Sequence, residues 1–374
     1  MIDRVLLYPY YLYLRLRDRY YSSPKRRLAV TQVPSVCVGN ITVGGTGKTP
    51  HVEMILRLLQ ESDRWGNAGL AVLSRGYRRE SKGFQQVSPD GSAAMFGDEP
   101  LQIKRKFPGV TVAVDKDRVE GCALLCDPSK LASKKYAGKC WNRDFPPADY
   151  IILDDAYQYR RLKPTLSIVL VDYNRPVMKD MLLPLGRLRD LPERLYDADV
   201  IIVSKCPDYI DLQEQKDFAA SMGVMNYDPG SCSGISRKGR RQDVFFTCVE
   251  YLPVQGAFDV TDPRYAYAKK AILVSGIAKD TALRKYLSDT YKIAARFSFP
   301  DHHKFTWSDI NRIQLALRKD HTAVIMTTEK DIQRLRDFPG LPREIMDRLF
   351  VVPIQTRFVS EVQRSVFKTL ITEI

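Results

Sequence analysis

Residues 36–49 read VCVGNITVGGTGKT, and they pass from an apolar strand through a glycine-rich loop into a helix. In such a loop the glycines let successive backbone N–H groups face a phosphate. Lys48 then reaches the β- and γ-phosphates, and the Thr49 hydroxyl ligates Mg²⁺. The strict pattern has a glycine where this chain has Thr42. The stretch predicts a P-loop that binds nucleotide through Thr42, Val43, Gly44, Gly45, Thr46, Gly47, Lys48 and Thr49.

A second acidic motif follows a later apolar run. Residues 150–153 are apolar and are followed directly by Asp154 and Asp155. A P-loop needs such a carboxylate at the end of a neighbouring strand, because the magnesium ion must be held on its far side. We therefore predict that Thr49 with Asp154 or Asp155 binds Mg²⁺. The chain has no N-K-x-D guanine-reading motif at Thr327–Asp331, which favours ATP over GTP.

Short apolar runs alternate with longer amphipathic segments along the whole chain, which is typical of parallel strands linked by helices. The expected fold is α/β, with a P-loop NTPase-like parallel sheet that has helices on both faces and a second, smaller α/β domain. Its expected strands lie at 35–38, 69–73, 110–114, 150–153, 167–171, 200–204, 244–248, 271–275, 291–297, 323–327 and 349–354. The expected boundaries are an N-terminal membrane-interface helix (1–30), a P-loop kinase domain (31–205), a connector (206–250) and a C-terminal α/β domain (251–374).

Composition narrows the class of protein. The 374 residues include 58 Lys and Arg against 44 Asp and Glu, a net charge of +14, and 44% of them are hydrophobic. These values exclude a disordered chain, a collagen and a bundle of membrane spans. The seven cysteines form no C-x-x-C pair, so we expect neither a zinc site nor a disulfide framework. The positive charge indicates a polyanionic partner, which is nucleic acid, anionic lipid or a phosphorylated substrate.

The first thirty residues carry seven Lys or Arg and six Tyr interleaved with Leu. No apolar run among them reaches the roughly 18–20 residues that span a bilayer. The pattern predicts a short amphipathic helix lying in an anionic membrane surface. The alternative is a surface helix packed on the core through its Tyr and Leu side chains. A second basic run at 237–241 has no assigned role.

Charged clusters that follow other strands give the chain a family resemblance. The motif blocks are VGNITVGGTGKTP, LSRGYRRESKG, GDEP, DRVEG, ILDDAYQYRRL, LPLGRLRD, SFPDHHKF and TTEKD, in that order between residues 38 and 331. Together they resemble the tetraacyldisaccharide 4′-kinases, the lipid A 4′-kinases of Gram-negative bacteria. The combination of this P-loop with SRGY, GDEP and FPDH is specific, whereas any one block alone is not.

The resemblance implies transfer of the ATP γ-phosphoryl group to the 4′-hydroxyl of tetraacyldisaccharide 1-phosphate, in lipid A biosynthesis. It places a peripheral or monotopic enzyme at the cytoplasmic face of the bacterial inner membrane, with ATP and Mg²⁺ as cofactors. By position, Asp98 of GDEP accepts the hydroxyl proton, His302 of FPDH assists it, and Lys48 completes the catalytic set. The residues expected to bind substrate are Arg75, Arg78, Arg118, Arg189 and Asp190. No nucleic acid and no obligate protein partner is expected.

Departures and alternatives accompany this interpretation. Tyr159 stands where the family usually has His, and Asp190 where it more often has Glu. The alternative functions are a nucleic-acid-stimulated P-loop ATPase, which the charge would suit, and a kinase of a soluble small molecule. Since Asp98 and His302 fall in different expected domains, we also expect the two domains to close when ATP binds.

Overall fold

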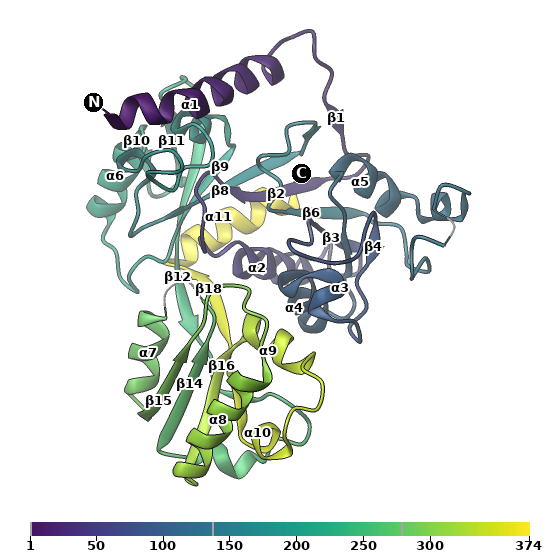
Figure 1. Ribbon diagram of the computed structural model, residues 1–374. Coiled ribbons are helices and arrows are strands. Elements are labelled where there is room, and N and C mark those ends of the chain that lie inside the picture. Colours follow the sequence, from purple (N-terminus) through teal and green to yellow (C-terminus); the bar gives the residue numbers. More distant parts are fainter. Residues whose placement is uncertain (1, 137, 278–279) are drawn as a thin grey trace.

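The computed structural model describes residues 2–136, 138–277 and 280–374, in which there are two main sheets of different size and one two-stranded sheet (Figure 1). The large sheet has 11 strands in the order β10-β11-β12-β9-β8-β2-β6-β3-β5-β4, with β18 paired to β12. The strands are β2 (Ser35–Asn40), β3 (Leu70–Ser74), β4 (Gln85–Gln86), β5 (Thr111–Val114), β6 (Tyr150–Asp154), β8 (Leu166–Asp172), β9 (Val200–Ser204), β10 (Val224–Asp228), β11 (Ser233–Ser236), β12 (Arg241–Tyr251) and β18 (Ile354–Phe358). A separate two-stranded pair joins β1 (Ala29–Val30) to β7 (Leu162–Lys163).

The middle of the large sheet is parallel and buried on both faces, as its continuous apolar strands predict. Successive side chains point to opposite faces, so Val36 and Val38 join one core cluster and Cys37 joins the other. The helices of this part are α1 (Ile2–Tyr21), α2 (Lys48–Gln60), α3 (Ala93–Phe96), α4 (Asp98–Lys106), α5 (Arg118–Cys126), α6 (Leu212–Ser221) and α11 (Glu361–Thr372). The prediction of an α/β fold with a mostly parallel sheet is confirmed.

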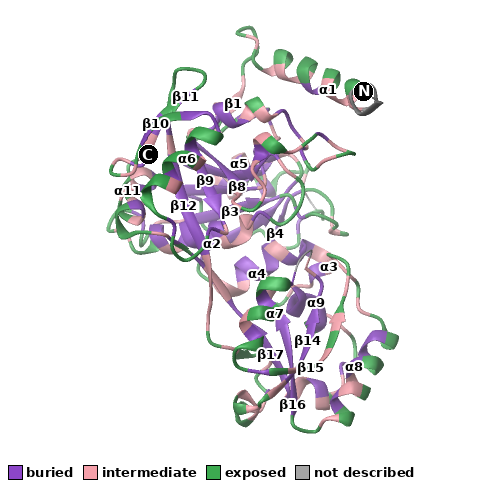
Figure 2. Cartoon of the chain, turned by 90° about the vertical axis from the view of Figure 1, so that its left-hand side faces the viewer, coloured by how far each residue is buried: buried purple, intermediate pink, exposed green. Residues whose placement is uncertain are grey.

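The small sheet has 5 strands in the order β13-β17-β16-β14-β15. They are β13 (Gln255–Gly256), β14 (Lys270–Ser275), β15 (Lys292–Ser298), β16 (Ala323–Thr328) and β17 (Leu349–Val352), and the helices beside them are α7 (Thr281–Ser288), α8 (Trp307–Lys319), α9 (Glu329–Arg336) and α10 (Arg343–Asp347). Ile310, Ile313 and Leu317 form the buried face of α8, as their spacing predicts. The central strands of both sheets are buried, while the outer faces of the helices are exposed (Figure 2).

Strand pairing differs from the expected boundaries at two places. Strands β10 to β12, expected in a connector, form one edge of the large sheet, because β12 pairs in parallel with β9. Strand β18 and helix α11, expected in the second domain, return to the first, where β18 pairs with β12. Phe245 of β12 and Phe367 of α11 are both buried in a core cluster of the large domain, where their rings pack against each other. The chain therefore crosses between the two sheets twice, on antiparallel neighbouring strands.

Helix α1 lies along one edge of the large domain (Figure 1). Leu14 is fully buried, and Tyr10 and Tyr11 pack beside it against the same core cluster. Other large side chains of the helix are exposed, and these are Tyr8, Leu12, Tyr13, Leu16 and Tyr20. Within the described residues no helix is both long enough and apolar enough to cross a membrane. One face of α1 thus packs on the protein, as the alternative interpretation expected, and another face stays open.

The return of α11 to the first domain can be tested by Phe367→Ala. The Phe367 ring is fully buried and its centroid lies 5.1 Å from that of Phe245 on β12. Its loss should lower the free energy of unfolding by about 3–5 kcal/mol, measured by urea denaturation. The matched control is Val362→Ala on the exposed face of the same helix, which should cost about 0.5 kcal/mol or less. Equal losses for the two variants would contradict the observed packing.

Candidate active site

The glycine-rich loop connects β2 to α2, and hydrogen bonds from side chains of the large sheet hold it in place. Gly47 has φ 87°, a left-handed conformation that glycine adopts without strain. Asn40 donates a hydrogen bond through Nδ2 to Thr46 Oγ1 at 2.8 Å, and Ser204 donates through Oγ to the Thr46 carbonyl at 2.9 Å. The curl of the loop is therefore built into the apolar sheet beneath it.

The first part of the loop pairs with a neighbouring segment. Val43 N–H donates to the Arg187 carbonyl at 2.7 Å, and Arg189 N–H donates to the Ile41 carbonyl at 2.9 Å. Thr42 forms an isolated β-bridge with Leu188. The N–H of Val43 is thus engaged, although we predicted it among the nucleotide-binding residues. Within the loop and the start of α2, the backbone N–H groups of five residues have no acceptor among the described residues: Gly44, Gly45, Gly47, Lys48 and Thr49.

The two carboxylates after β6 have different surroundings. Asp154 is 4% exposed, its Oδ2 accepts a hydrogen bond from Ser74 Oγ at 3.0 Å, and its Oδ1 has no partner among the described residues. Burial, with a smaller contribution from Asp155, raises the pKa of Asp154 to about 6. Burial also acts to raise the pKa of Asp155, but Lys48 and Arg189 outweigh it and hold that pKa below its usual range. Asp154 therefore has the free, buried oxygen that a cation would satisfy, while Asp155 is already paired with two cations.

Lys205, a residue that our sequence reasoning missed, contacts the loop from the end of β9. Its Nζ donates to the Gly45 carbonyl and, at 2.7 Å, to Asp172 Oδ2 at the end of β8. Both residues follow apolar runs that we had predicted to be strands. The rule that charged residues at the carboxyl ends of parallel strands converge on the site could have found them.

His51 supports the loop from within α2. Its Nδ1 lies 2.7 Å from the Gly47 carbonyl, which can only accept, so Nδ1 carries the proton and Nε2 accepts from the Thr247 hydroxyl at 2.9 Å. Burial lowers the pKa of His51 to about 4, which keeps the ring neutral. Thr247 belongs to β12, so a strand expected in the connector helps to hold the P-loop.

Asp98 stands at the start of α4 and meets the second domain. The carboxylate is 6% exposed, and its Oδ2 accepts from Arg334 Nε at 2.9 Å and lies 2.9 Å from His302 Nδ1. Burial acts to raise the pKa of Asp98, but the hydrogen bonds from His302 and Arg334 outweigh it and lower that pKa. The structure thus brings together the Asp98 and His302 that sequence reasoning paired. Arg334 is a third partner that we did not predict.

Lys330 orients the histidine from the other side. Its ammonium contacts Glu99 at 2.7 Å, Asp301 at 2.9 Å and His302 Nε2 at 3.3 Å. An ammonium group can only donate, so Nε2 is the acceptor and the ring proton is on Nδ1, directed at Asp98. Lys330 belongs to the TTEKD motif at the start of α9, which packs against α4.

The residues expected to bind substrate separate into two groups. Arg75 and Arg78 follow β3, are exposed and make no ion pair within the described residues. Arg118, in contrast, has a buried guanidinium, which donates to the carbonyls of Asp115 and Lys116 at 3.0 and 3.2 Å. Its bonds brace the backbone beside the site and leave it little reach toward a substrate.

Arg189 and Asp190 are adjacent in the chain, but the Arg189 side chain lies toward Asp155 and the Asp190 side chain toward helix α1. The Arg189 guanidinium donates to both carboxylate oxygens of Asp155 and to the Asn40 side chain. Asp190 is 1% exposed, its Oδ1 accepts from Leu191 N–H at 2.9 Å, and its Oδ2 accepts from Arg17 of α1 at 2.8 Å. Both oxygens of Asp190 are therefore engaged inside the protein. We expected Asp190 to contact substrate; in the structure its carboxylate anchors α1.

The chain is similar to known proteins along nearly its whole length. The family model of tetraacyldisaccharide-1-P 4′-kinase matches residues 4–372. The tetraacyldisaccharide 4′-kinase of Phocaeicola vulgatus is 37% identical over 347 residues, which are 91% of this chain and 86% of that protein. The enzyme of the same name from Parabacteroides distasonis is 36% identical over 368 residues, which are 96% and 90% of the two chains.

The chain belongs to the tetraacyldisaccharide-1-P 4′-kinase family. The resemblance seen in the sequence is therefore confirmed. A crystal structure of LpxK from Aquifex aeolicus in complex with ATP shares the fold, with a TM-score of 0.65 and 24% identity, over 100% of this chain and 99% of that one.

Tyr159, which stands where members of the 4′-kinase family usually have histidine, has a structural contact. Its hydroxyl donates to Asp117 Oδ1 at 2.6 Å, at the N-terminus of α5. Burial, with the bond to Asp117, raises the pKa of Tyr159 to about 12. The phenol therefore stays protonated and donates to Asp117, the residue that caps the start of α5.

The anchoring of α1 can be tested in this family member by Arg17→Met. The change leaves Asp190 buried with only Arg194, at 4.0 Å, as a distant cation, and breaking a buried pair costs about 3–5 kcal/mol. We expect α1 to open and its tyrosines to be cut much faster by chymotrypsin in limited digestion. Arg19→Met is the matched control, because Arg19 is exposed on the same helix. Equal cleavage rates for the two variants would show that the pair does not hold the helix.

Proposed function

We propose that the chain is an ATP-dependent kinase that phosphorylates the 4′-hydroxyl of tetraacyldisaccharide 1-phosphate in lipid A biosynthesis. The observation that carries the proposal is the contact between Asp98 and His302 across two domains, beside a P-loop of this family. A sugar hydroxyl is a poor nucleophile. Phosphoryl transfer to its oxygen is therefore helped by a carboxylate within hydrogen-bond reach that accepts the hydroxyl proton. The structural relative from Aquifex aeolicus binds ATP, which supports ATP as the donor.

The triphosphate would lie over the free amides of the loop, with Lys48 on its β- and γ-phosphates. Lys48 Nζ is 3.8 Å from Asp155 Oδ1 and comes from the first turn of α2. Its cationic charge and the helix N-terminus together favour the anionic end of the nucleotide.

The residues present fit a magnesium ion. Asp154 offers a buried oxygen without a partner, and the Thr49 hydroxyl makes no hydrogen bond within the described residues. These two hard oxygen donors are the kind that Mg²⁺ prefers. When bound, the ion would neutralise charge on the phosphates. Asp155 would act mainly by holding Lys48 and Arg189 in place.

Asp98 would receive the proton of the 4′-hydroxyl. The hydrogen bonds that Asp98 accepts from His302 and Arg334 within the described residues all go to its Oδ2, which leaves Oδ1. Oδ1 is therefore the oxygen left for the substrate. His302, held by Lys330, keeps the carboxylate oriented through its Nδ1 proton.

The open face of α1 supports peripheral attachment to the cytoplasmic face of the inner membrane. Tyr8, Leu12, Leu16 and Tyr20 are exposed at a four-residue spacing, so they form one stripe along the helix. Aromatic and leucine side chains beside arginines suit the headgroup region of an anionic membrane. The nucleic-acid alternative gains no support from the basic run at 237–241, which forms the β11–β12 turn and pairs in part with Asp197.

The activity is tested by transfer of label from γ-labelled ATP to tetraacyldisaccharide 1-phosphate. Wild type should transfer label, and Asp98→Asn should lose about 10²- to 10⁴-fold in kcat, because the amide cannot accept the proton. Lys48→Ala should also lose activity, because it removes the cation that we place on the β- and γ-phosphates. The control is Arg240→Gln, an exposed position on the β11–β12 turn, which should keep wild-type activity. Absence of transfer by the wild type would refute the proposed function.

The lowered pKa of Asp98 gives a pH prediction. Because Arg334 and His302 favour the ionised form, the acid limb of kcat/KM should lie below the usual carboxylate range. Arg334→Gln removes a cation, so the pKa of Asp98 rises and the acid limb moves to higher pH. Arg334→Lys keeps the charge and should move it less. An acid limb that stays in place in Arg334→Gln would mean that a group other than Asp98 controls it.

A further inference from the structure

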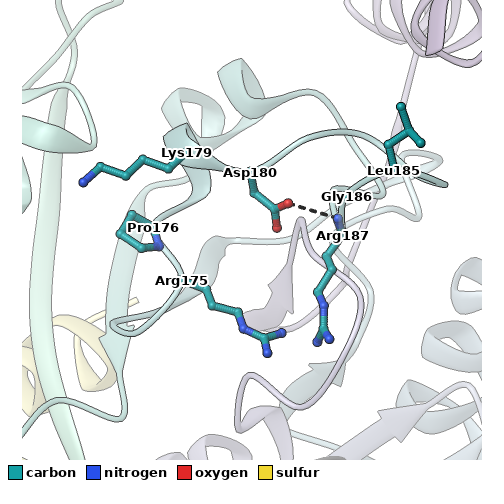
Figure 3. Close-up of a pocket in the computed structure, with 7 residues that line it drawn as sticks. All are labelled: Arg175, Pro176, Lys179, Asp180, Leu185, Gly186 and Arg187. Carbon is teal, nitrogen blue, oxygen red and sulfur yellow. Dashed lines mark hydrogen bonds between the residues drawn. The ribbon is translucent and has the colours of Figure 1, made fainter. Parts of the chain in front are cut away.

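A pocket of about 370 Å³ lies on the outer side of the P-loop, between the end of β8 and the segment 180–187 (Figure 3). Its lining includes three cationic side chains, Arg175, Lys179 and Arg187, and a single acidic one, Asp180. The guanidinium groups of Arg175 and Arg187 point into the same space, whereas Lys179 extends away from it (Figure 3). The volume is within the roughly 300–1,000 Å³ of small-molecule sites.

The positive charge of this pocket is not compensated. Asp180 uses its Oδ1 to accept from the backbone N–H groups of Met181, at 2.8 Å, and Arg187, at 3.1 Å. Within the described residues no carboxylate lies within 4.0 Å of the Arg175 or Arg187 guanidinium, although nearby Arg189 and Arg194 are both paired. Like charges that converge without a partner repel each other, and a bound anion would remove that cost.

Backbone hydrogen bonds hold the segment that carries Arg187 in one conformation. Leu183 N–H donates to the Leu188 carbonyl at 3.0 Å, and Gly186 N–H to the Leu182 carbonyl at 3.0 Å. A Cβ at Gly186 would lie 2.1 Å from the Met181 carbonyl oxygen, so only glycine fits there. The backbone bond from Val43 then ties Arg187 to the P-loop. The site is thus preorganised, which lowers the entropy lost on binding.

Arg187 lies close to the phosphate loop but outside its cradle. A Cβ at Gly44 would be 3.5 Å from Arg187 Nη1. The amides that face the nucleotide start at Gly44, whereas the Val43 N–H is turned toward Arg187. We infer that an anion bound by Arg187 would lie next to the triphosphate of the nucleotide and would belong to another molecule.

We propose that Arg175 and Arg187 bind the phosphate monoester of the acceptor, an inference that rests on the proposed function. A guanidinium matches the geometry of phosphate oxygens and donates two hydrogen bonds to them. Met181 and Leu185 of the same segment are 49% and 40% exposed, so apolar groups border the cations. That combination suits the headgroup of an acylated sugar phosphate better than a nucleotide. The pocket therefore sets the preference for an acceptor that already carries a phosphate.

The test compares two acceptors, tetraacyldisaccharide 1-phosphate and the same disaccharide with a free 1-hydroxyl. Arg175→Gln and Arg187→Gln should each raise the KM for the phosphorylated acceptor by about tenfold and leave the KM for ATP unchanged. The wild-type preference for the phosphorylated acceptor, as a ratio of kcat/KM values, should fall by the same factor. Arg240→Gln removes one exposed arginine elsewhere and should keep both the KM and the preference.

Two results would overturn the assignment. One is an unchanged acceptor preference in both arginine variants, and the other is a rise in the KM for ATP instead, which would make the nucleotide the occupant. Equilibrium binding of the phosphorylated disaccharide in detergent micelles keeps the test independent of catalysis. Binding by wild type that Arg187→Gln weakens supports the pocket even where no transfer occurs, and equal binding refutes it. Failure of wild-type transfer alone counts against the proposed function.

Discussion

The Oδ2 atom of the Asp98 carboxylate accepts hydrogen bonds from two side chains of the second domain, Arg334 and His302. A buried carboxylate is costly unless cations or donors satisfy it, so this contact constrains how α4 and α9 lie against each other. The same contact has a chemical consequence. It keeps Asp98 ionised by lowering its pKa, and it leaves Oδ1 as the free acceptor. The interaction that joins the domains is thus also the one that prepares the proposed base.

The geometry depends in turn on the way the chain crosses between domains. Strands β12 and β18 run antiparallel, with Thr247 opposite Phe358 and Tyr251 opposite Ile354. Two hydrogen-bonded strands restrict rotation more than a single linker does, so α9 keeps its approach to α4. Because β12 is also the neighbour of β9, and its Thr247 bonds to His51, the crossing is continuous with the support of the P-loop.

A second chain of contacts links the N-terminal helix to the nucleotide site. Arg17 of α1 holds Asp190, and the Tyr10 hydroxyl donates to the Arg189 carbonyl at 2.9 Å. The Arg189 side chain then clamps Asp155, which pairs with Lys48. The four consecutive residues 187–190 therefore contact four different parts of the protein. Arg187 lines the acceptor pocket that we propose, and Leu188 forms a β-bridge with Thr42 of the P-loop. Arg189 pairs with Asp155, and Asp190 anchors α1.

Apolar periodicity and loop motifs are local signals, so the amino-acid sequence predicted the central strands of both sheets, the P-loop and the family, but not the edge strands β10 and β11. It also paired Asp98 with His302, although only through the family resemblance. The tertiary structure alone decided the partners that come from distant segments, such as Arg334 on Asp98 and Lys205 on Gly45. It also decided that Asp190 is buried on α1 and that α11 returns to the first sheet. An arginine, an aspartate or an amphipathic helix looks the same in a sequence whether its partner is solvent, substrate or another domain, and only packing makes that choice.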